Sequence, residues 1–342
     1  MTNSTKSASR REVVRASAGV LASVAAAPLI LPGMSRAERH EPVEASSQNG
    51  NGFYRFKVGD FWATVISDGY HDAPIAPNYA PNASAEELAD VLKANFMQPV
   101  LQSTSNALVV DTGRERILID SGWGEKLGHA FGDFAQLGSN LRRAGIGLES
   151  IDLVVISHGH LDHIGGLISG SGTIAFPKAT FVFVDAEWNY WTGSRCESDV
   201  MSSPMPAAIK KGMLTAARDT LPVVAARSRF LKPGGEIVPG VHYVPAPGHS
   251  PSHAAILFSS GNEQFMFMAD VAHNPVTGLQ HPEWTPIFDF DPVLAIKTRK
   301  AILDRAATER LTVMGYHFPF PSVGHVAEYK TAFRWEPIQW VW

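Results

Sequence analysis

The sequence predicts an α/β fold in which two β-sheets pack back to back and helices cover their outer sides. Two halves of the chain are rich in strand patterns, and each is followed by helical stretches, which is typical of layered α/β domains. The 342 residues are 45% hydrophobic and 18% charged, an ordinary composition for a globular protein with a sizeable core. The length alone suits one large domain or two small ones.

The first half is predicted to hold two hairpins, two capped or glycine-terminated helices and two strands that run into loops. Ser84 and Glu87 form a capping-box pattern at the start of one helix, and Thr112–Gly113 marks the turn of the second hairpin. In chain order, the predicted elements are a hairpin at 53–69, a Pro-rich loop at 71–84, a helix at 84–96, a hairpin at 107–122, a helix at 134–147, a buried strand at 151–160, and a strand followed by a helix at 179–191.

The second half repeats the same kinds of element without repeating any sequence at a fixed short period. Its strands are strongly apolar and are separated by a Pro/Gly/His loop and a Ser-Gly-Asn turn. The predicted elements are a helix at 204–221, three strands within 240–270, an amphipathic helix at 291–310 and a last buried strand at 311–317.

The first 37 residues resemble a secretory signal of the twin-arginine type. Arg10 and Arg11 stand side by side before an Ala-rich, uncharged run that ends among small residues and prolines. Cleavage after Ala27 or Ala37 fits the preference for small residues. A membrane anchor or an amphipathic helix is the alternative interpretation. The export interpretation predicts a periplasmic protein.

The remaining chain is predicted to consist of a polar linker or N-terminal arm at 38–52 and a folded domain at 53–342. The net charge of −4 and the absence of long basic runs argue against nucleic-acid binding. After the signal, no uninterrupted apolar run of membrane-spanning length follows, so no membrane association is expected after cleavage. A single cysteine, Cys196, excludes an intrachain disulfide and makes thiolate metal ligation a poor interpretation.

Residues 157–166, "SHGHLDHIGG", carry four potential metal ligands directly after a buried strand. His158 and His160 alternate along extended backbone, so both imidazoles can reach one point. Asp162 and His163 lie where the loop turns into a helix and are expected to face a second point nearby. An N-cap role is the alternative for Asp162.

Three further ligands are predicted because a histidine or an acid at the end of an apolar strand needs a partner. These are His249 in the Pro/Gly/His loop, Asp270 at the end of "FMFMAD" and His317 at the end of "LTVMGYH". Two sites then follow, with Asp270 as a bridging carboxylate: one made of His158, His160 and His249, and one made of Asp162, His163 and His317. The nitrogen and oxygen donors suit two Zn²⁺ ions, although manganese, iron and cobalt also fit.

Together, these motifs resemble the metallo-β-lactamase fold, and within it most closely the methyl parathion hydrolases and their lactonase-like relatives. The resemblance extends from about Gly52 to near the C-terminus. It implies an αββα sandwich of two mixed sheets with helices outside, metals at one edge between the sheets, and a homodimer. In true metallo-β-lactamases no carboxylate bridges the metals, whereas Asp270 is placed to do so. Glyoxalase II has the same ligand set, but its glutathione-binding C-terminal region is not recognisable here.

The predicted activity is hydrolysis of an ester-like bond by a hydroxide that bridges two divalent metal ions, with Asp162 and Asp270 as the catalytic carboxylates. Small-molecule lactones and aryl esters are the expected substrates, and organophosphate triesters such as methyl parathion fit the same site. The alternatives are hydrolytic dehalogenation of an activated aromatic compound, β-lactam opening, and metal binding without catalysis.

Several other residues are assigned supporting roles. Asp120 is expected to steady the histidine loop, with a turn or N-cap role as the alternative, and Asp68 is interpreted as a turn residue. His253 and His325 are interpreted as residues that lie behind the ligands or pack nearby. An aromatic substrate wall is predicted from Trp188, Tyr190, Trp191, Trp284 and Phe288, with Tyr190 as a possible proton donor to the leaving group; helix packing or a dimer interface is the alternative for each.

Overall fold

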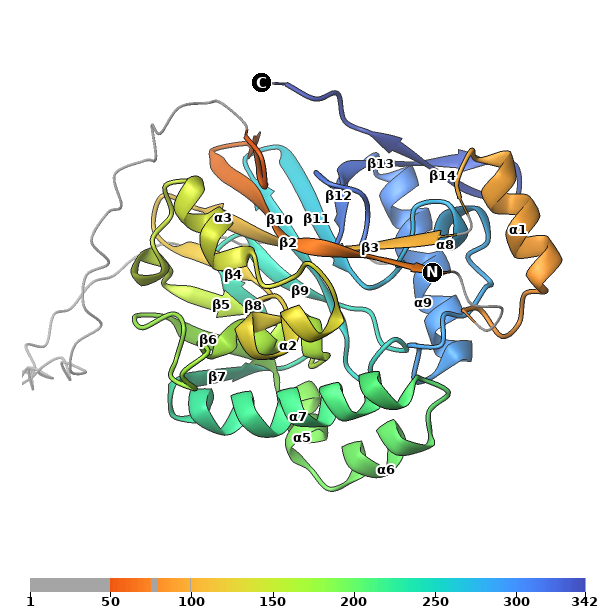
Figure 1. Cartoon of the computed structure of the whole chain (residues 1–342). Coiled ribbons are helices and arrows are strands. Elements are labelled where there is room, and N and C mark those ends of the chain that lie inside the picture. The colour runs from red at the N-terminus through yellow and green to blue at the C-terminus, as the bar shows by residue number, and fades with distance from the viewer. Residues whose placement is uncertain (1–49, 75–78, 99, 342) are drawn as a thin grey trace, which may run out of the picture. The chain divides into compact units, whose positions relative to one another are not determined.

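Two seven-stranded β-sheets form the centre of the protein, and helices lie on their outer sides (Figure 1). The structure is a computed structural model that describes residues 50–74, 79–98 and 100–341. The predicted signal at 1–37 and the predicted arm up to residue 49 lie outside the described residues. The α/β fold class and the two mixed sheets predicted from the sequence are confirmed.

The first sheet has its strands in chain order, so each strand lies beside the next one along the sequence. The first three pairings are antiparallel and the last three are parallel. Its strands are β1 (Phe53–Val58), β2 (Phe61–Pro74), β3 (Val100–Asp111), β4 (Arg116–Ile119), β5 (Leu153–Val155), β6 (Thr180–Val184) and β7 (Ser228–Leu231).

The second sheet also follows the chain order and is antiparallel except for one parallel pair, β11 with β12. Parallel pairing matters here because it brings the carboxyl ends of two strands to the same edge. The strands are β8 (Glu236–Val238), β9 (Val241–Pro245), β10 (Ala254–Ser260), β11 (Glu263–Ala269), β12 (Thr312–Gly315), β13 (Val323–Tyr329) and β14 (Ala332–Pro337).

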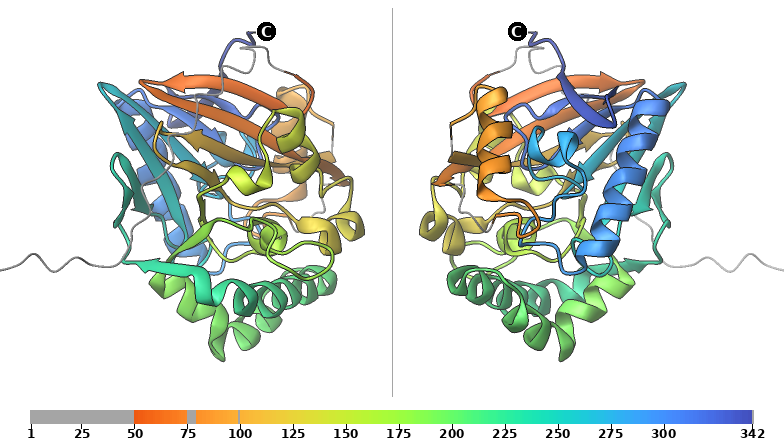
Figure 2. Two further views of the ribbon diagram at one scale, coloured as in Figure 1. Left: turned by 90° about the vertical axis from the view of Figure 1, so that its left-hand side faces the viewer. Right: turned by 90° about the vertical axis from the view of Figure 1, so that its right-hand side faces the viewer.

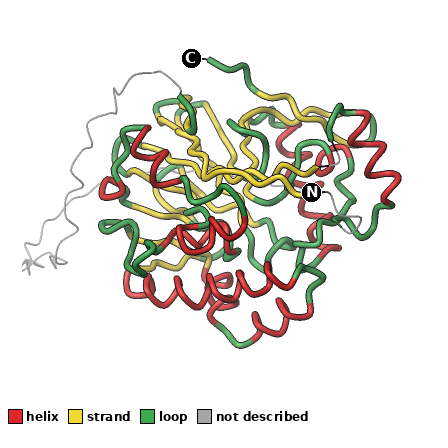
Figure 3. Tube along the Cα trace, viewed as in Figure 1, coloured by secondary structure: helices red, strands yellow, loops and turns green. Residues whose placement is uncertain are grey.

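The helices surround the strands (Figure 3). They are α1 (Ala85–Ala94), α2 (Gly124–Phe131), α3 (Leu137–Arg143), α4 (Leu161–Ile164), α5 (Asp185–Thr192), α6 (Arg195–Ser202), α7 (Ala207–Val224), α8 (Thr277–Gln280) and α9 (Pro292–Thr308), with short 3-10 turns at η1 (Leu148–Ser150), η2 (Gly165–Leu167) and η3 (Ala225–Arg227). None of the described helices is both long and apolar enough to cross a membrane.

Alternation along the strands divides the core into layers. On β6, Val182 and Val184 face the second sheet, whereas Phe181 and Phe183 face the helices of the first sheet. On β11, Phe265 and Phe267 join the layer between the sheets, and the intervening Met266 packs towards α9. The helices α3, α5 and α7 cover the first sheet and α9 covers the second (Figure 2). The result is an αββα sandwich.

Some elements differ from the sequence-based expectations. The second strand of the first hairpin does not end at Gly69 but continues past a bulge between Ser67 and Gly69 to Pro74, into the stretch predicted to be a loop. The helices α2, α6 and α8 and the strands β7, β8, β13 and β14 were not predicted. Most of these strands are short or half-exposed edge strands, in which polar residues weaken the alternation on which the prediction depends.

One edge of the sandwich gathers the ends of the strands that carry polar residues. The parallel strands β4 and β5 end side by side and are followed by Asp120 and by the segment with Ser157. The parallel strands β11 and β12 are followed directly by Asp270 and Tyr316. The residues Asp120 and Ala269 both have positive φ, 59° and 48°. Such a conformation is uncommon for residues other than glycine.

Candidate metal centre

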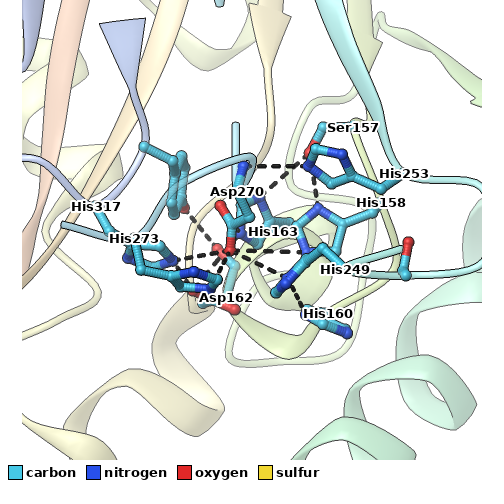
Figure 4. A network of polar contacts seen from close by, with 12 residues as sticks. Ser157, His158, His160, Asp162, His163, His249, His253, Asp270, His273 and His317 are labelled. Carbon is cyan, nitrogen blue, oxygen red and sulfur yellow. Dashed lines mark hydrogen bonds and ion pairs between the residues drawn. The ribbon is translucent and has the colours of Figure 1, made fainter. Parts of the chain in front are cut away.

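The seven sequence-predicted ligands come together at this edge of the sandwich (Figure 4). They arrive from four separate segments: the loop and helix after β5, the loop before β10, the end of β11 and the end of β12. All are almost inaccessible to solvent, and none is more than 7% exposed: His158, His160, Asp162, His163, His249, Asp270 and His317.

The first group is made of His158, His160 and His249, whose ligand atoms all lie within 4.8 Å of one another. The His249 Nε2 atom is 2.9 Å from His160 Nδ1 and 3.3 Å from Asp270 Oδ2. The His158 Nε2 atom is 3.9 Å from the same Asp270 oxygen. Three imidazoles and one carboxylate oxygen therefore face one point.

The second group is made of Asp162, His163 and His317 and adjoins the first through Asp270. The Nε2 atoms of His163 and His317 are 3.6 and 3.4 Å from Asp162 Oδ2. Asp270 turns Oδ1 towards His163, at 3.4 Å, and Oδ2 towards His317, at 3.1 Å. In Figure 4, Asp270 lies between His317 on one side and His158 and His249 on the other. Its two oxygens thus face both groups.

Metal binding fits this arrangement because several buried atoms that face the cluster have no hydrogen-bond partner. These atoms are His158 Nε2, His163 Nε2 and Asp270 Oδ1. Buried polar atoms without partners are rare in native proteins because desolvation leaves them uncompensated. A nitrogen and oxygen donor set of this kind matches the ligands of divalent cations such as zinc. The cluster is therefore suited to two divalent metal ions.

The protonation states of three of the seven residues suit ligation directly. Burial and the neighbouring imidazoles hold the pKa values of His158 and His160 well below the ordinary histidine value, so both are neutral. Burial alone would raise the pKa of Asp270, but His317 and His163 outweigh burial and hold it well below its usual range. A neutral imidazole and an ionised carboxylate are the forms that bind a cation. For His163, His249 and His317, burial alone would lower the pKa values, but the neighbouring carboxylates, Asp270 above all, raise them, so a bound cation would have to displace a proton there.

Most of the imidazoles of the cluster are held from behind by a hydrogen bond to the ring nitrogen that faces away from it. The Nδ1 atoms of His163 and His317 donate to Asp120 Oδ2 and Thr104 O, both at 2.7 Å. The His249 Nδ1 atom lies 3.0 Å from Asp289 Oδ1. Such bonds fix the orientation of the ring and raise its basicity as a ligand.

Asp120 connects the end of β4 to the histidine loop. It is fully buried and also accepts hydrogen bonds from the Ser157 backbone N–H at 2.8 Å and the Ser157 hydroxyl at 2.7 Å. The segment after the histidine loop lies very close to the end of β4, since a Cβ atom added to Gly166 would be 1.9 Å from Ser121 O. Burial raises the pKa of Asp120, and the adjacent His163 opposes this effect. Asp120 thus holds both His163 and the start of the loop.

A buried ion pair stands behind His249. Asp289 accepts a hydrogen bond from Arg299 at 2.8 Å. Burial alone would raise the pKa of Asp289, but His249 and Arg299 outweigh burial and lower it. Arg299 is only 1% exposed and also donates to the backbone oxygens of Val271, Pro282 and Trp284. The guanidinium thereby attaches the segment after Asp270 to α9. Neither Asp289 nor Arg299 was predicted from the sequence.

His273 is an additional histidine at the cluster that sequence reasoning missed. Its Nε2 atom lies 3.4 Å from Asp270 Oδ2, and its ring stacks on His317 at 5.3 Å with an interplanar angle of 9°. It forms a further possible ligand group with His249 and Asp270. Unlike four of the five predicted histidine ligands, His273 has no partner for its second ring nitrogen, Nδ1. The sequence signal that could have indicated His273 is its position three residues after Asp270.

A cavity of about 330 Å³ opens onto the cluster. Asp162, Asp270, His273 and His317 line one part of it. Much of the remaining wall is apolar and comes from α2, α7 and neighbouring segments, with Phe131, Ile209, Met213, Leu161, Pro206 and Phe288. A metal-binding end and an apolar wall are typical of a site for a small molecule with an apolar portion.

Of the five aromatic residues predicted to line the pocket, only Phe288 contributes to the cavity wall. Trp188 packs instead between Phe183 and Phe230, with ring centroids at 4.9 and 5.0 Å. Trp284 belongs to a small cluster with the buried face of α1. The helix α5 turns its aromatic side chains towards the sheet core and the neighbouring α6. This arrangement matches helix packing, the alternative to a substrate wall that the sequence left open.

The other two aromatic residues are held by acids. Trp191 is buried and donates its indole N–H to Glu187 at 2.8 Å, and its ring meets His160 edge-on at 5.6 Å. Tyr190 donates to Asp199 at 3.3 Å and does not line the cavity, so it is not placed to protonate a leaving group there.

His253 lies behind Asp270. Its Nδ1 donates to Ala246 O at 3.0 Å, and its Nε2 accepts the backbone N–H of Asp270 at 3.1 Å. Burial lowers the pKa of His253 to about 3, so the ring is neutral and fixes the backbone of Asp270. His325, in contrast, lies exposed on β13 and its Nδ1 donates to Leu311 O, away from the cluster.

Asp68 differs from its interpretation as a turn residue. It lies within β2 at the bulge, is fully buried, and accepts the backbone N–H groups of Trp123 and Leu137, both at 2.8 Å. Burial raises its pKa to about 7. Asp68 therefore links the loops that precede α2 and α3.

Comparison with solved structures identifies proteins of the same architecture. AidC, a dizinc quorum-quenching lactonase with a bound product, is 26% identical, with a TM-score of 0.76 over 85% of this chain and 98% of AidC. The hydrolase AbOPH is 25% identical, with a TM-score of 0.77 over 86% of this chain and all of AbOPH. An N-acyl homoserine lactone hydrolase with product at its metal centre shares the fold, with 18% identity and a TM-score of 0.53 over 78% of this chain and 100% of that hydrolase. No curated protein sequence matches the chain.

The family comparison agrees with the geometry. Residues 101–317, which include all seven predicted ligands, match the model of the metallo-beta-lactamase superfamily. This match covers more than half of the chain, and the two sheets, the outer helices and the histidine-rich edge are all in place. The chain belongs to the metallo-beta-lactamase superfamily.

Proposed function

We propose that this protein is a dinuclear zinc-dependent hydrolase that opens lactones bearing an apolar chain. The observation that carries the proposal is the junction of the His/Asp cluster with the cavity, where Asp162, Asp270 and His317 face an apolar wall that includes Phe131, Ile209 and Met213. An ester carbonyl would sit at the cluster, and an apolar substituent would lie along the wall.

The size of the cavity supports a small-molecule substrate. Its volume of about 330 Å³ lies at the lower end of the range of about 300–1,000 Å³ that is usual for ligand pockets. Leu161 and Met213 come from α4 and α7, which pack together beneath the histidine loop. The apolar wall is therefore built on helices, and it can exclude water from the part of the substrate that it covers.

Two bound divalent cations would supply a water molecule with a pKa near 7 and would polarise the carbonyl oxygen. The side chains of the cluster would position the groups that take part in the reaction. Asp162 lines the cavity and is 7% exposed, so its carboxylate can take a proton from the nucleophile and return it to the leaving oxygen. Asp270 holds its two oxygens towards the two ligand groups and keeps them together.

Similarity to AidC, a dizinc lactonase with a bound product, supports both the reaction and the metal. Aryl esters and organophosphate triesters such as methyl parathion share an electrophilic centre beside a leaving oxygen, and we include them as secondary substrates of the same site. The lactone is preferred because two of the similar structures are lactonases with bound product.

The test combines metal analysis with a panel of substrates. The purified protein is expected to contain two equivalents of zinc and to hydrolyse acyl-chain lactones faster than aryl esters, methyl parathion, halogenated aromatics or cephalosporins. Asp270→Ala should lose metal and activity together, because its carboxylate faces both groups. Two tightly bound zinc ions with no turnover on any substrate would contradict the enzymatic proposal and favour a metal-binding protein. Full activity of Asp270→Ala would contradict the bridging role.

We also propose that the protein is exported to the periplasm by the twin-arginine route and acts as a homodimer. Substitution of both Arg10 and Arg11 by Lys should retain the precursor in the cytoplasm, and cell fractionation would show this. Unchanged periplasmic delivery would contradict the route. Light scattering coupled to gel filtration should give twice the mass of the mature chain, and a monomer mass would contradict the dimer.

A further inference from the structure

Glu187 is a buried acid whose carboxylate accepts four hydrogen bonds. It lies on α5 and is only 2% exposed. Its Oε1 atom accepts from Gly159 N at 3.0 Å, Trp191 Nε1 at 2.8 Å and Ser250 Oγ at 2.7 Å. Its Oε2 atom accepts from Ser252 N at 2.8 Å. No basic residue is among these partners, so the carboxylate is satisfied by neutral donors alone.

Three of the four donors, Gly159, Ser250 and Ser252, belong to the segments that carry the first ligand group. Gly159 lies between His158 and His160, and Ser250 follows His249 directly. One carboxylate therefore joins two loops that are about 90 residues apart in the sequence, and all three imidazoles of the group are next to an anchored residue. The other ligand group has no hydrogen bond to Glu187.

His160 depends on this arrangement most. His158 and His249 have partners at Nδ1, but the outward-facing Nε2 atom of His160 has none. Its ring is instead fixed by packing, with the edge of Trp191 at 5.6 Å and Phe290 at 5.6 Å. Trp191 is itself oriented by its hydrogen bond to Glu187. Glu187 thus acts on His160 through both the backbone and the indole.

The contact between the loop and the indole leaves no room for adjustment. A Cβ atom added to Gly159 would be 2.3 Å from Trp191 Cδ1, well inside any normal contact. The backbone between the two histidines therefore rests directly on the Trp191 ring. A shift of the indole would displace this backbone and, with it, both imidazoles.

We propose that Glu187 is a positioning residue that preorganises the first ligand group, His158, His160 and His249, for one of the two cations. This inference rests on the metal centre proposed above. Loss of the carboxylate should weaken the cation at this group and spare the cation at Asp162, His163 and His317, which Glu187 does not contact.

The substitution Glu187→Gln tests the charge and the acceptors with little change of volume. Gly159, Ser252 and Trp191 present N–H groups, which can only donate. A glutamine has one acceptor oxygen, so its amide NH₂ must face at least one of these N–H groups. A buried donor is then left without an acceptor, and the loop can be held only in a distorted position.

The experiment measures Zn²⁺ and Co²⁺ binding to the metal-depleted full chain by competition with a chromophoric chelator. For E187Q we expect one of the two affinities to fall by about 10- to 100-fold, the range found when a residue behind a metal ligand is lost. The Co²⁺ absorption bands of that site should change as well. Thermal unfolding of the metal-free proteins, measured in parallel, separates this loss from a general loss of stability.

Two ligand variants identify the affected site. In H317A, which weakens the second group, E187Q should lower the affinity of the remaining cation by the same factor as in the wild-type chain. In H160A, which weakens the first group, E187Q should add little, because the two changes act on one site. An equal effect in both backgrounds, or unchanged affinities in E187Q, would overturn the proposal. A wild-type protein that binds no cation would overturn the metal centre itself.

Glu125 provides a matched control, because it is an exposed glutamate that accepts a backbone N–H, from Gly170 at 2.9 Å. E125Q should leave both cation affinities unchanged. If E187Q does not fold, S250A and W191F decide the question, since each removes a single donor from the carboxylate. A smaller loss confined to the first site supports the proposal, and unchanged affinities in both overturn it.

Discussion

Asp120 Oδ2 lies 2.7 Å from His163 Nδ1, and neither side chain is exposed to solvent. This hydrogen bond joins the end of β4 to the short helix that carries Asp162 and His163. The positive φ of Asp120 turns the chain at this point, and its second oxygen holds the Ser157 backbone N–H. The orientation of one imidazole at the metal centre is thus set by a carboxylate on another strand.

Replacement of Asp120 by Asn should weaken the cation at Asp162, His163 and His317. The amide has no negative charge and only one acceptor oxygen, whereas the carboxylate serves His163 and Ser157 together. We expect a loss of about 10- to 100-fold in Zn²⁺ affinity at that group. Chelator competition measures it. D111N is the control, since Asp111 pairs with Arg116 away from the cluster, and an equal loss in D111N would contradict the specific role.

Arg299→Met should destabilise the fold strongly. The guanidinium is buried, pairs with Asp289 at 2.8 Å and donates to three backbone oxygens, so its removal leaves an uncompensated buried carboxylate. The expected cost is about 3–5 kcal/mol in the free energy of unfolding, which urea denaturation measures. Arg305→Met, at the partly exposed pair with Glu309, should cost at most about 0.5 kcal/mol. Similar values for the two variants would show that Arg299 is not a structural anchor.

Met213→Trp should restrict the length of the substrate chain. Met213 lies on α7 and lines the cavity, so a larger side chain there reduces the volume next to Phe131 and Ile209. We expect kcat/KM for long-chain lactones to fall by about tenfold or more, corresponding to about 1.4 kcal/mol, while short-chain lactones change little. Met201→Trp is the control, because Met201 is 56% exposed and lies outside the cavity. A uniform loss for all chain lengths would contradict this placement of the chain.

The buried acid Asp68 predicts a pH dependence of stability. Burial raises its folded-state pKa to about 7 from an ordinary value of 3.8. A raised pKa means that the folded state keeps the proton longer than the unfolded state. The protonated Asp68 therefore contributes to the free energy of unfolding. This stabilisation is fully present below about pH 4 and is lost as the pH rises towards 7.

Comparison with Asp68→Asn isolates this effect. The variant lacks the titrating group, so the stability advantage of the wild-type chain over D68N should shrink between about pH 4 and pH 7 and then level off. Urea unfolding across this range, with a chelator present to remove any metal effect, measures it. D90N, at an exposed position on α1, shows whether loss of a surface carboxylate alone alters the profile. If the stability advantage of the wild-type chain over D68N grew with pH, this result would contradict a raised pKa of Asp68.

The sequence by itself determined the class of fold and the kinds of atom at the site. Short, strongly apolar runs specified most of the central strands, because each inner strand packs on both faces, as the split of β6 between two core layers shows. The cluster at 157–166 and the strand-end residues His249, Asp270 and His317 stood out because polar side chains at such positions need partners. These features are local in the sequence and can be recognised there.

Only the tertiary structure decided which side chains support that site and where a substrate would lie. Glu187 contacts Ser252 across 65 residues, and Arg299 contacts Asp289 from a different element, so no local pattern distinguishes either from a surface charge. The aromatic residues of α5 were expected in the pocket, but the rotation of that helix buries Trp191 against His160 and leaves the apolar wall to α2 and α7. Helix orientation is set by packing over the whole domain, which is the physical reason that the residues around the cluster could not be predicted from local patterns.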